Sequence, residues 1–271
     1  IYVATGAAYR ALAVASAQSL RGHEPGRAID LFTDAPGAPG LGVFDRVHPV
    51  PRAHARAKLE CLPLSRFRRT LYLDCDTLVL APLGDLFDIL GRFDLALAHD
   101  MRRASALIRA GRVPTPYAFP QMNSGVLLYR LTTPVRGLLA EWSRRFHAEG
   151  ARRDQPILKD LLWESDIRFY VLPPEFNLRR VTMLDVWEPR DARPTILHSH
   201  RLLQHLRVES APVLSDPAAI VAAERAALAA EWARAGQGGA DTDPVARHLA
   251  AADAPEPESG GEAVPPLPPG C

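Results

Sequence analysis

The sequence alternates short apolar stretches with amphipathic stretches, and this alternation limits the fold more than any other feature. Apolar runs typical of strands are predicted at residues 1–5, 28–33, 44–50, 70–73, 93–98, 126–130, 169–172 and 195–197. Apolar residues at helical spacing predict helices at residues 8–21, 52–62, 83–90, 135–147, 155–163 and 217–235. This order predicts an α/β fold whose mostly parallel mixed sheet is flanked by helices and binds ligands at the carboxyl ends of its strands.

Residues 236–271 differ from the rest of the chain, because glycine, proline, alanine and acidic residues dominate them. Such a composition cannot bury enough apolar surface to offset chain entropy, so we predict a disordered tail after a single domain at residues 1–235. The chain has a net charge of +1, and the tail has six acidic residues against one arginine, so the domain carries +6. That charge is too small to indicate a nucleic-acid partner.

The cellular context is predicted from cysteines and hydropathy. Three cysteines without a CxxC pair exclude a disulfide framework and favour a reducing, cytoplasmic compartment. No apolar run reaches the roughly 18–20 residues of a membrane span, so no transmembrane segment is expected. The sequence does not begin with Met, so the lack of a leader carries no weight.

The strongest candidate for a site is the run LYLDCDT at residues 71–77, where an apolar strand ends in Asp74 and Asp76. Side chains two residues apart on an extended backbone point the same way, so both carboxylates can reach one cation. Carboxylate oxygens suit Mg²⁺ or Mn²⁺, and two carboxylates leave coordination positions open for a diphosphate.

Two alternatives compete with this interpretation. In the first, Asp76 merely caps a turn where the strand ends. In the second, the pair is the Asp-x-Asp of haloacid-dehalogenase-type phosphatases, which have Thr or Val two residues after the second Asp. Leu78 holds that position here, so the second alternative does not match.

Residues 1–200 resemble retaining glycosyltransferases of the GT-A type, specifically the glycogenin-like family 8. The resemblance rests on KLEC at residues 58–61, LYLDCDTLVL at 71–80 and DLFD at 85–88. Weaker matches follow in order at residues 123–126 (NSGV), 154–155 (DQ), 173–177 (PPEFN) and 196–198 (ILH). The resemblance implies a GT-A-like (Rossmann-like) fold and a nucleoside-diphosphate-sugar transferase.

The resemblance also implies roles for individual residues. The metal ligands would be Asp74, Asp76 and His198, holding Mn²⁺ or Mg²⁺. Asp154 and Lys58 would act on the reacting sugar and the leaving diphosphate. The donor would contact Thr5, Tyr9, Lys58, Asn123, Ser124, Gln155 and Arg201, with Tyr9 stacking on the base.

Several of these residues also have a purely structural interpretation. Lys58 fits a solvated helix face, Tyr9 fits core packing, and Asp154 fits the N-cap of the following helix. Asn123 and Ser124 fit a polar turn before a strand. His200 competes with His198 as metal ligand, because Ser199-His200-Arg201 replaces the family's usual continuation.

The predicted function is metal-dependent, retaining transfer of a sugar to an acceptor hydroxyl, and the resemblance favours a hexose-type sugar on a UDP-linked donor. One alternative is a sugar-nucleotide hydrolase or nucleotidyltransferase on a similar fold. An alternative of another class is a non-catalytic binding module that uses the Pro-rich tail. The sequence leaves the acceptor and the oligomeric state open.

Overall fold

The computed structural model describes residues 1–101, 105–208 and 210–234. The predicted disordered tail at residues 236–271 lies outside the described residues. Among the described helices, none combines the length and apolar character that crossing a membrane requires.

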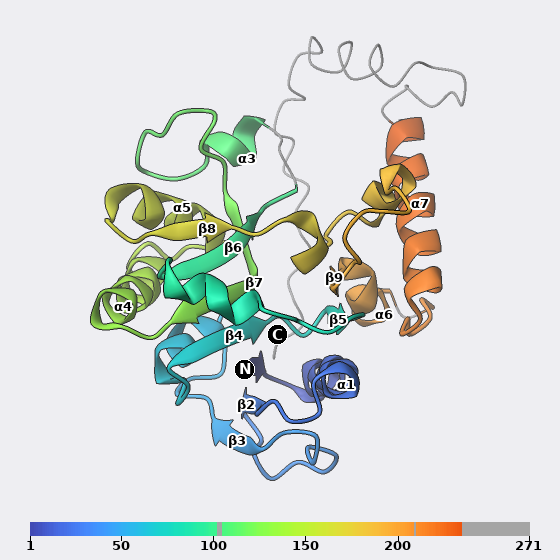
Figure 1. Cartoon of the computed structure of the whole chain (residues 1–271), viewed down its shortest axis with the longest axis horizontal. Coiled ribbons are helices and arrows are strands. Elements are labelled where there is room, and N and C mark those ends of the chain that lie inside the picture. The colour runs from blue at the N-terminus through green and yellow to red at the C-terminus, as the bar shows by residue number, and fades with distance from the viewer. Residues whose placement is uncertain (102–104, 209, 235–271) are drawn as a thin grey trace.

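Two hydrogen-bonded sheets, one of three strands and one of four, lie side by side at the centre of the molecule (Figure 1). Parallel pairing joins β1 (Tyr2–Ala4), β2 (Asp30–Thr33) and β3 (Arg46–Pro49). Antiparallel pairing places β7 (Met122–Arg130) between β4 (Arg69–Leu73) and β6 (Leu95–His99), and β8 (Phe169–Val171) runs parallel to β6. Two backbone hydrogen bonds of Ile1 connect the halves, because its N donates to Leu71 O at 2.6 Å and its O accepts from Leu73 N at 3.1 Å. These bonds place β1 beside β4, so the two sheets together follow the order β3-β2-β1-β4-β7-β6-β8 and are treated below as one main sheet.

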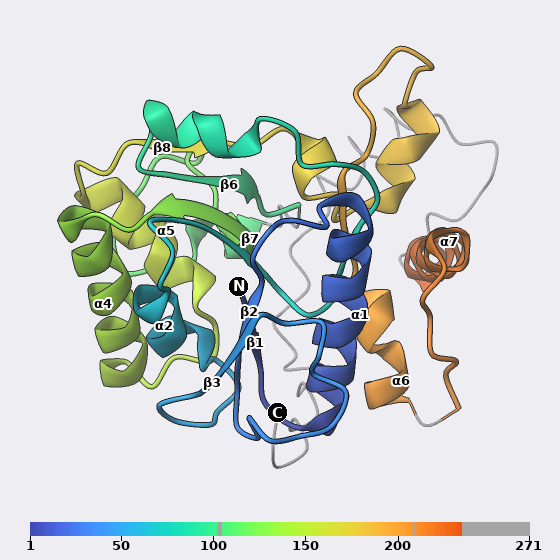
Figure 2. The same ribbon diagram turned by 60° about the horizontal axis from the view of Figure 1, so that its bottom comes forward.

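Helices cover both faces of this sheet (Figure 2). On one face lie α2 (Lys58–Cys61), α4 (Thr133–Ala148) and α5 (Gln155–Glu164), and on the other lies α1 (Ala7–His23). Successive residues of β4 point to opposite faces, so Leu71 and Leu73 pack in one core while Tyr72 packs in the other. Burial on both faces explains why the central strands have apolar runs, such as Leu71–Leu73 of β4, and the predicted α/β fold is confirmed.

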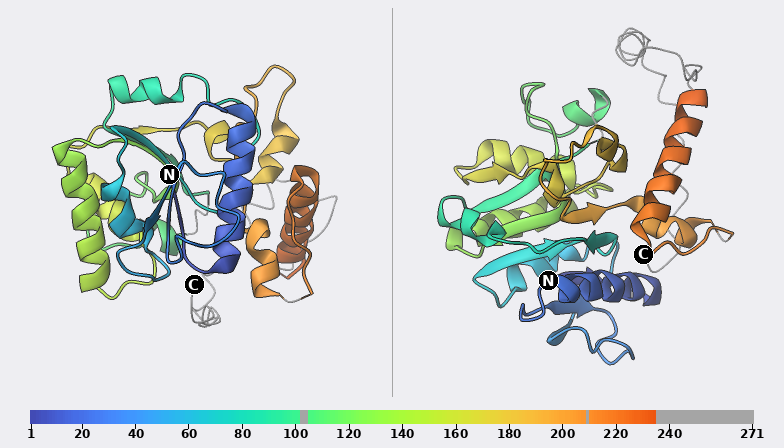
Figure 3. Two further views of the ribbon diagram at one scale, coloured as in Figure 1. Left: turned by 90° about the horizontal axis from the view of Figure 1, so that it is seen from below. Right: turned by 45° about the vertical axis from the view of Figure 1, so that its right-hand side comes forward.

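A smaller ribbon lies beside the main sheet. It consists of β5 (Thr77–Val79) and β9 (Ile196–His198), which pair antiparallel with Thr77 opposite His198. After β9 come a 3₁₀ helix at His200–Leu203, α6 (Gln204–Arg207) and the long α7 (Pro217–Arg234) at the edge of the molecule (Figure 3). A short α3 (Ser105–Arg109) precedes β7. The ribbon brings the end of β9 to the acidic turn after β4.

Three expected elements differ from the structure. The helix predicted over residues 52–62 forms only at Lys58–Cys61, because the residues before it make turns in which the Ala57 amide bonds to His54 O. The helix expected at residues 83–90 is a 3₁₀ helix at Leu86–Gly91. The expected strand at residues 126–130 begins earlier, at Met122, so the polar residues before it belong to β7 and do not form a turn.

Candidate functional site

Two carboxylates and one imidazole meet where β4 ends. Asp74 and Asp76 lie in the turn between β4 and β5, and the β5–β9 pairing brings His198 to the same place. The Nε2 atom of His198 lies 3.3 Å from Asp76 Oδ1 and 3.9 Å from Asp74 Oδ2. One ligand atom from each of the three side chains lies within 4.8 Å of the others, so the three groups can share one cation.

A hydrogen-bond network fixes the orientation of the His198 ring. The backbone N of Gly125 can only donate, and it donates to Asn123 Oδ1 at 3.0 Å. Asn123 Oδ1 also accepts from Asn177 Nδ2 at 3.0 Å, so the other end of that amide, Asn177 Oδ1, faces His198 Nδ1 at 2.9 Å. Nδ1 therefore carries a proton, and Nε2, which has the lone pair when the ring is neutral, faces the two carboxylates. This is the arrangement that a metal-binding histidine requires.

The ionisation of these groups also suits a cation. Burial alone would raise the pKa of Asp76, but the adjacent imidazole groups of His198 and His200 favour the ionised carboxylate and hold this pKa well below its usual range. Burial lowers the pKa of His198, which favours the neutral imidazole. An ionised carboxylate and a neutral imidazole are the forms that bind a metal. The chemistry of the donor set therefore fits a divalent cation.

The same cluster is packed tightly against Gly125 of β7. A Cβ atom added at Gly125 would lie 2.1 Å from His198 Cε1 and 2.6 Å from Asp74 Oδ2. These distances are too short for any side chain, so the glycine is required by the close approach of the two ligands to the strand.

Replacing Gly125 by alanine is expected to displace His198 and Asp74 and to weaken Mn²⁺ binding by more than about tenfold, as loss of ligand support does. Overpacking is also expected to destabilise the fold by roughly 1–3 kcal/mol. Calorimetric Mn²⁺ titration and thermal denaturation measure the two effects. Gly137→Ala in α4 is the matched control, because its Cβ would meet nothing within 4 Å. Equal Mn²⁺ affinity in both variants would show that the ligands do not depend on this packing.

His200 reaches the cluster from the other side. Its Nδ1 lies 3.3 Å from Asp76 Oδ2, and Arg179 Nη2 lies 2.7 Å from its Nε2. Arginine can only donate, so Nε2 of His200 accepts and Nδ1 donates its proton to Asp76. In this geometry His200 orients a carboxylate, whereas His198 presents a lone pair.

A third carboxylate, Asp154, lies immediately before α5 and is buried. Its Oδ1 is 3.3 Å from Arg56 Nε, and its Oδ2 is 3.4 Å from Lys58 Nζ and accepts from Ser124 Oγ at 3.0 Å. Burial would raise the pKa of Asp154, but the charges of Lys58 and Arg56 outweigh burial and lower it. The side chain makes no hydrogen bond to the first turn of α5, so it does not act as an N-cap.

Lys58 joins Asp154 to the acidic turn. Its Nζ lies 3.4 Å from Asp74 Oδ1 as well as 3.4 Å from Asp154 Oδ2, and it donates to Ser124 Oγ at 2.9 Å. The hydroxyl of Tyr72 donates to Asp74 Oδ1, and Lys58 Nζ lies 5.4 Å from the centre of the Tyr72 ring. Only 8% of the Lys58 side chain is exposed, so it does not lie on a solvated helix face.

A cleft of about 210 Å³ opens beside these groups. Of the residues predicted from the sequence, it is lined by Thr5, Tyr9, Lys58, Asp74 and Asp76. Tyr9 also packs against the apolar core, so its two interpretations are compatible. The cleft thus brings the predicted nucleotide-contacting residues and the acidic turn to one surface.

Other predicted donor contacts have partners within the protein. Gln155 Nε2 donates to Asp100 Oδ2 at 2.9 Å and to Met122 O at 3.1 Å. Asn123 serves the network around His198. Arg201 Nε donates to Glu224 Oε2 of α7 at 2.6 Å, and Arg201 lines a neighbouring cavity, not the cleft. The structure therefore does not bring Arg201 to the acidic turn.

Three residues of the site were not singled out from the sequence. Arg56 precedes Lys58 by two positions, and in an arginine-rich chain nothing distinguished it. Asn177 lies between β8 and β9, where only the weak match at residues 173–177 pointed to it. Arg207 lines the cleft from α6, an element that the sequence did not predict.

The fold is shared with solved glycosyltransferases. The galactosyltransferase LgtC, crystallised with donor and acceptor sugar analogues, matches with a TM-score of 0.50 and 19% identity over 73% of this chain and 86% of that chain. Mouse xyloside xylosyltransferase 1, in its apo form, matches with a TM-score of 0.50 and 17% identity over 73% of this chain and 96% of that chain. No family model and no curated protein matches the chain. The chain therefore has a GT-A-type glycosyltransferase fold, and membership of family 8 stays a prediction.

Proposed function

We propose that the chain is a metal-dependent retaining glycosyltransferase that moves a sugar, of hexose type, from a UDP-linked donor to an acceptor hydroxyl. One observation carries the proposal: a cation-ready cluster, Asp74, Asp76 and His198, is joined through the buried Lys58 to the buried Asp154. These groups line the end of β4 in a fold that solved glycosyltransferases share. We assign the reaction to the domain at residues 1–235. We expect the protein to act in the cytoplasm.

Asp74, Asp76 and His198 would hold Mn²⁺ or Mg²⁺. Such an ion supplies a Lewis acid that offsets the negative charge developing on a departing diphosphate. His200 keeps Asp76 oriented through its Nδ1 proton. The Asn123–Asn177 network keeps the Nε2 lone pair of His198 available.

The remaining residues act on the donor. Lys58 supplies a positive charge between Asp74 and Asp154. Its Nζ is already held in place by a hydrogen bond to Ser124 Oγ, so the side chain does not have to move when charge develops on the substrate. Asp154, held ionised by two cations, stabilises positive charge on the sugar ring as the glycosidic bond to the diphosphate breaks. Thr5 and Tyr9 contact the nucleotide, and Ser124 and Gln155 contact the sugar after exchanging their present partners. Arg201 would contact phosphate only after leaving Glu224.

Thermal denaturation with UDP tests the proposal without knowledge of the acceptor. With Mn²⁺ present and UDP at 100 times its Kd, binding is expected to stabilise the chain by about 2.7 kcal/mol, a rise in Tm of roughly 5–10 °C. Without metal, the shift is expected to shrink to a small fraction of this value. An equal shift without metal, or none with UDP, would contradict the proposal. UDP binding without release of UDP from any UDP-sugar would indicate the non-catalytic binding module.

A further inference from the structure

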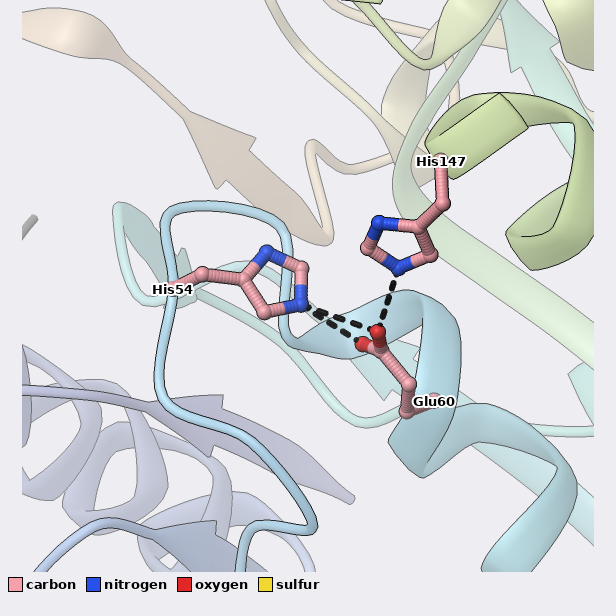
Figure 4. A group of neighbouring side chains, drawn as sticks. All are labelled: His54, Glu60 and His147. Carbon is pink, nitrogen blue, oxygen red and sulfur yellow. Dashed lines mark hydrogen bonds and ion pairs between the residues drawn. The ribbon is translucent and has the colours of Figure 1, made fainter. Parts of the chain in front are cut away.

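A second cluster of titratable side chains lies beside the cleft (Figure 4). It contains His54 from the loop before α2, Glu60 from α2 and His147 from the end of α4. His54 Nε2 lies 3.0 and 2.9 Å from the two carboxylate oxygens of Glu60, and His147 Nε2 lies 2.6 Å from Glu60 Oε1. Both rings point their Nε2 atoms at one carboxylate.

The backbone decides which nitrogen of His54 carries the proton. The amide N of Arg56 donates to His54 Nδ1 at 3.2 Å. An amide can only donate, so Nδ1 accepts, and the proton of the neutral ring is on Nε2 and is donated to Glu60. The three groups are close enough to share a cation. A metal ion would have to bind the lone pair of His54 Nε2, but in this arrangement Nε2 carries a proton and has no free lone pair.

The same hydrogen bond connects the cluster to the candidate site. Arg56 is bonded to His54 through its backbone, while its guanidinium Nε lies 3.3 Å from Asp154 Oδ1. Both His54 and Arg56 line the cleft. A continuous chain of contacts thus runs from Glu60 and His147 through His54 and Arg56 to the carboxylate that the proposed function places at the reacting sugar.

Protonation of His54 would interrupt this series of contacts at the hydrogen bond between His54 and Arg56. A positively charged imidazole carries protons on both nitrogens, so its Nδ1–H would oppose the Arg56 N–H, and the bond that holds Arg56 would be lost. The charged and titratable groups that face the ring are Glu60 from α2, His147 from α4 and Arg56 of its own loop. The arginines of α4 pair elsewhere, because Arg144 and Arg145 both bind Glu141.

We propose that His54 is a positioning residue for sugar transfer, acting on Asp154 through Arg56 only while its ring is neutral. The inference rests on the proposed function. Neutral His54 fixes Arg56 and maintains turnover, whereas uptake of a proton releases Arg56. Turnover is therefore lower in the form of the protein in which His54 has taken up a proton.

Two substitutions of His54 distinguish the role of its Nδ1 atom from the role of its Nε2 atom. The change His54→Asn leaves a carbonyl oxygen as acceptor at the position of Nδ1, within reach of the Arg56 amide two residues on, and the new side chain cannot take up a proton. The change His54→Gln leaves a donor toward Glu60 and removes the acceptor for that amide. The exposed His23→Gln is the matched control at a site far from the cleft.

Steady-state release of UDP from a UDP-sugar with Mn²⁺ is measured from pH 5.5 to 8 for all four proteins. At pH 8, His54→Gln is expected to lose roughly 2- to 13-fold in kcat, the value of one hydrogen bond, with little change in the KM for the donor. His54→Asn is expected to lose less activity between pH 8 and 5.5 than the wild type loses. Identical pH profiles for wild type and His54→Asn, or equal kcat for His54→Gln and His23→Gln, would overturn the inference while leaving the proposed function standing.

A second measurement does not depend on activity. Long-range ¹⁵N–¹H correlation spectra of the wild type at pH 7.5, assigned with His54→Asn, report the protonated nitrogen of His54. The expected result is the Nε2–H form, and addition of Zn²⁺ is expected to leave it unchanged. An Nδ1–H form, or displacement of the Nε2 proton by Zn²⁺, would overturn the inference even if the wild type transfers no sugar.

Discussion

Replacing Asp76 by asparagine is expected to reduce Mn²⁺-dependent release of UDP from a UDP-sugar by more than about 100-fold, since loss of an outer-sphere partner alone typically costs 10- to 100-fold. Asp76 is buried, and its Oδ1 lies 3.3 Å from His198 Nε2. The adjacent His198 and His200 outweigh the effect of burial and hold the pKa of Asp76 well below its usual range. The amide keeps the size of the side chain but removes the charge. Steady-state kinetics at saturating and limiting Mn²⁺ measure the loss.

Asp166→Asn is the control for this experiment, because it makes the same change of charge at an exposed residue after α5. It is expected to retain the activity and Mn²⁺ affinity of the wild type. Full metal-dependent activity in Asp76→Asn would remove Asp76 from the metal site and, with it, the basis of the proposed function.

Replacing Asp154 by asparagine is expected to lower kcat by roughly 100- to 1,000-fold, the usual effect of losing one fixed group that stabilises charge in the transition state. Its carboxylate lies 3.3 Å from Arg56 Nε and 3.4 Å from Lys58 Nζ, and these cations keep it ionised by lowering its pKa against the effect of burial. Mn²⁺ and UDP should still bind, because Asp74, Asp76 and His198 are unchanged. Rapid-mix kinetics and calorimetric UDP titration separate the two effects.

The two carboxylate variants therefore predict different losses. Asp76→Asn should weaken Mn²⁺-dependent UDP binding, whereas Asp154→Asn should leave UDP affinity within about threefold, a difference of less than about 1 kcal/mol. If Asp154→Asn instead lost UDP affinity and kept kcat, Asp154 would act in nucleotide binding and not at the sugar.

The sequence predicted those parts of the site that local pattern determines. The run Leu71–Leu73 of β4 is apolar because both faces of the strand are buried there, and its abrupt end at Asp74 is visible in the sequence. The alternation of strands and helices likewise predicted the α/β fold. The roles of the individual residues stay predictions, although the structure places Asp74, Asp76 and His198 together.

The rest depends on contacts between distant segments. Strand β5 is only three residues long, so its pairing with β9, which brings His198 to Asp76, has no clear sequence signal. Asn177 reaches His198 from a loop, and its role follows only from the hydrogen bonds that start at Gly125. Local periodicity cannot report any of these contacts.

The arginines show the same limit. Arg201 follows β9 and was expected to contact phosphate, but Glu224, 23 positions further along the chain, binds its guanidinium at 2.6 Å. Arg56 was expected in a helix over residues 52–62, yet the hydrogen bond from its amide to His54 belongs to a turn. Which arginine faces the cleft is decided by tertiary packing and not by residue type.

The most direct test of the central claim is ¹H NMR of the wild-type chain with a panel of UDP-sugars, with and without Mn²⁺. The anomeric signal of the donor is followed over time, and water serves as acceptor when no other is supplied. We predict that the signal of at least one donor disappears as UDP is formed, and that this happens only with Mn²⁺. Donors that all remain intact with Mn²⁺, or that are consumed equally without it, would contradict the account.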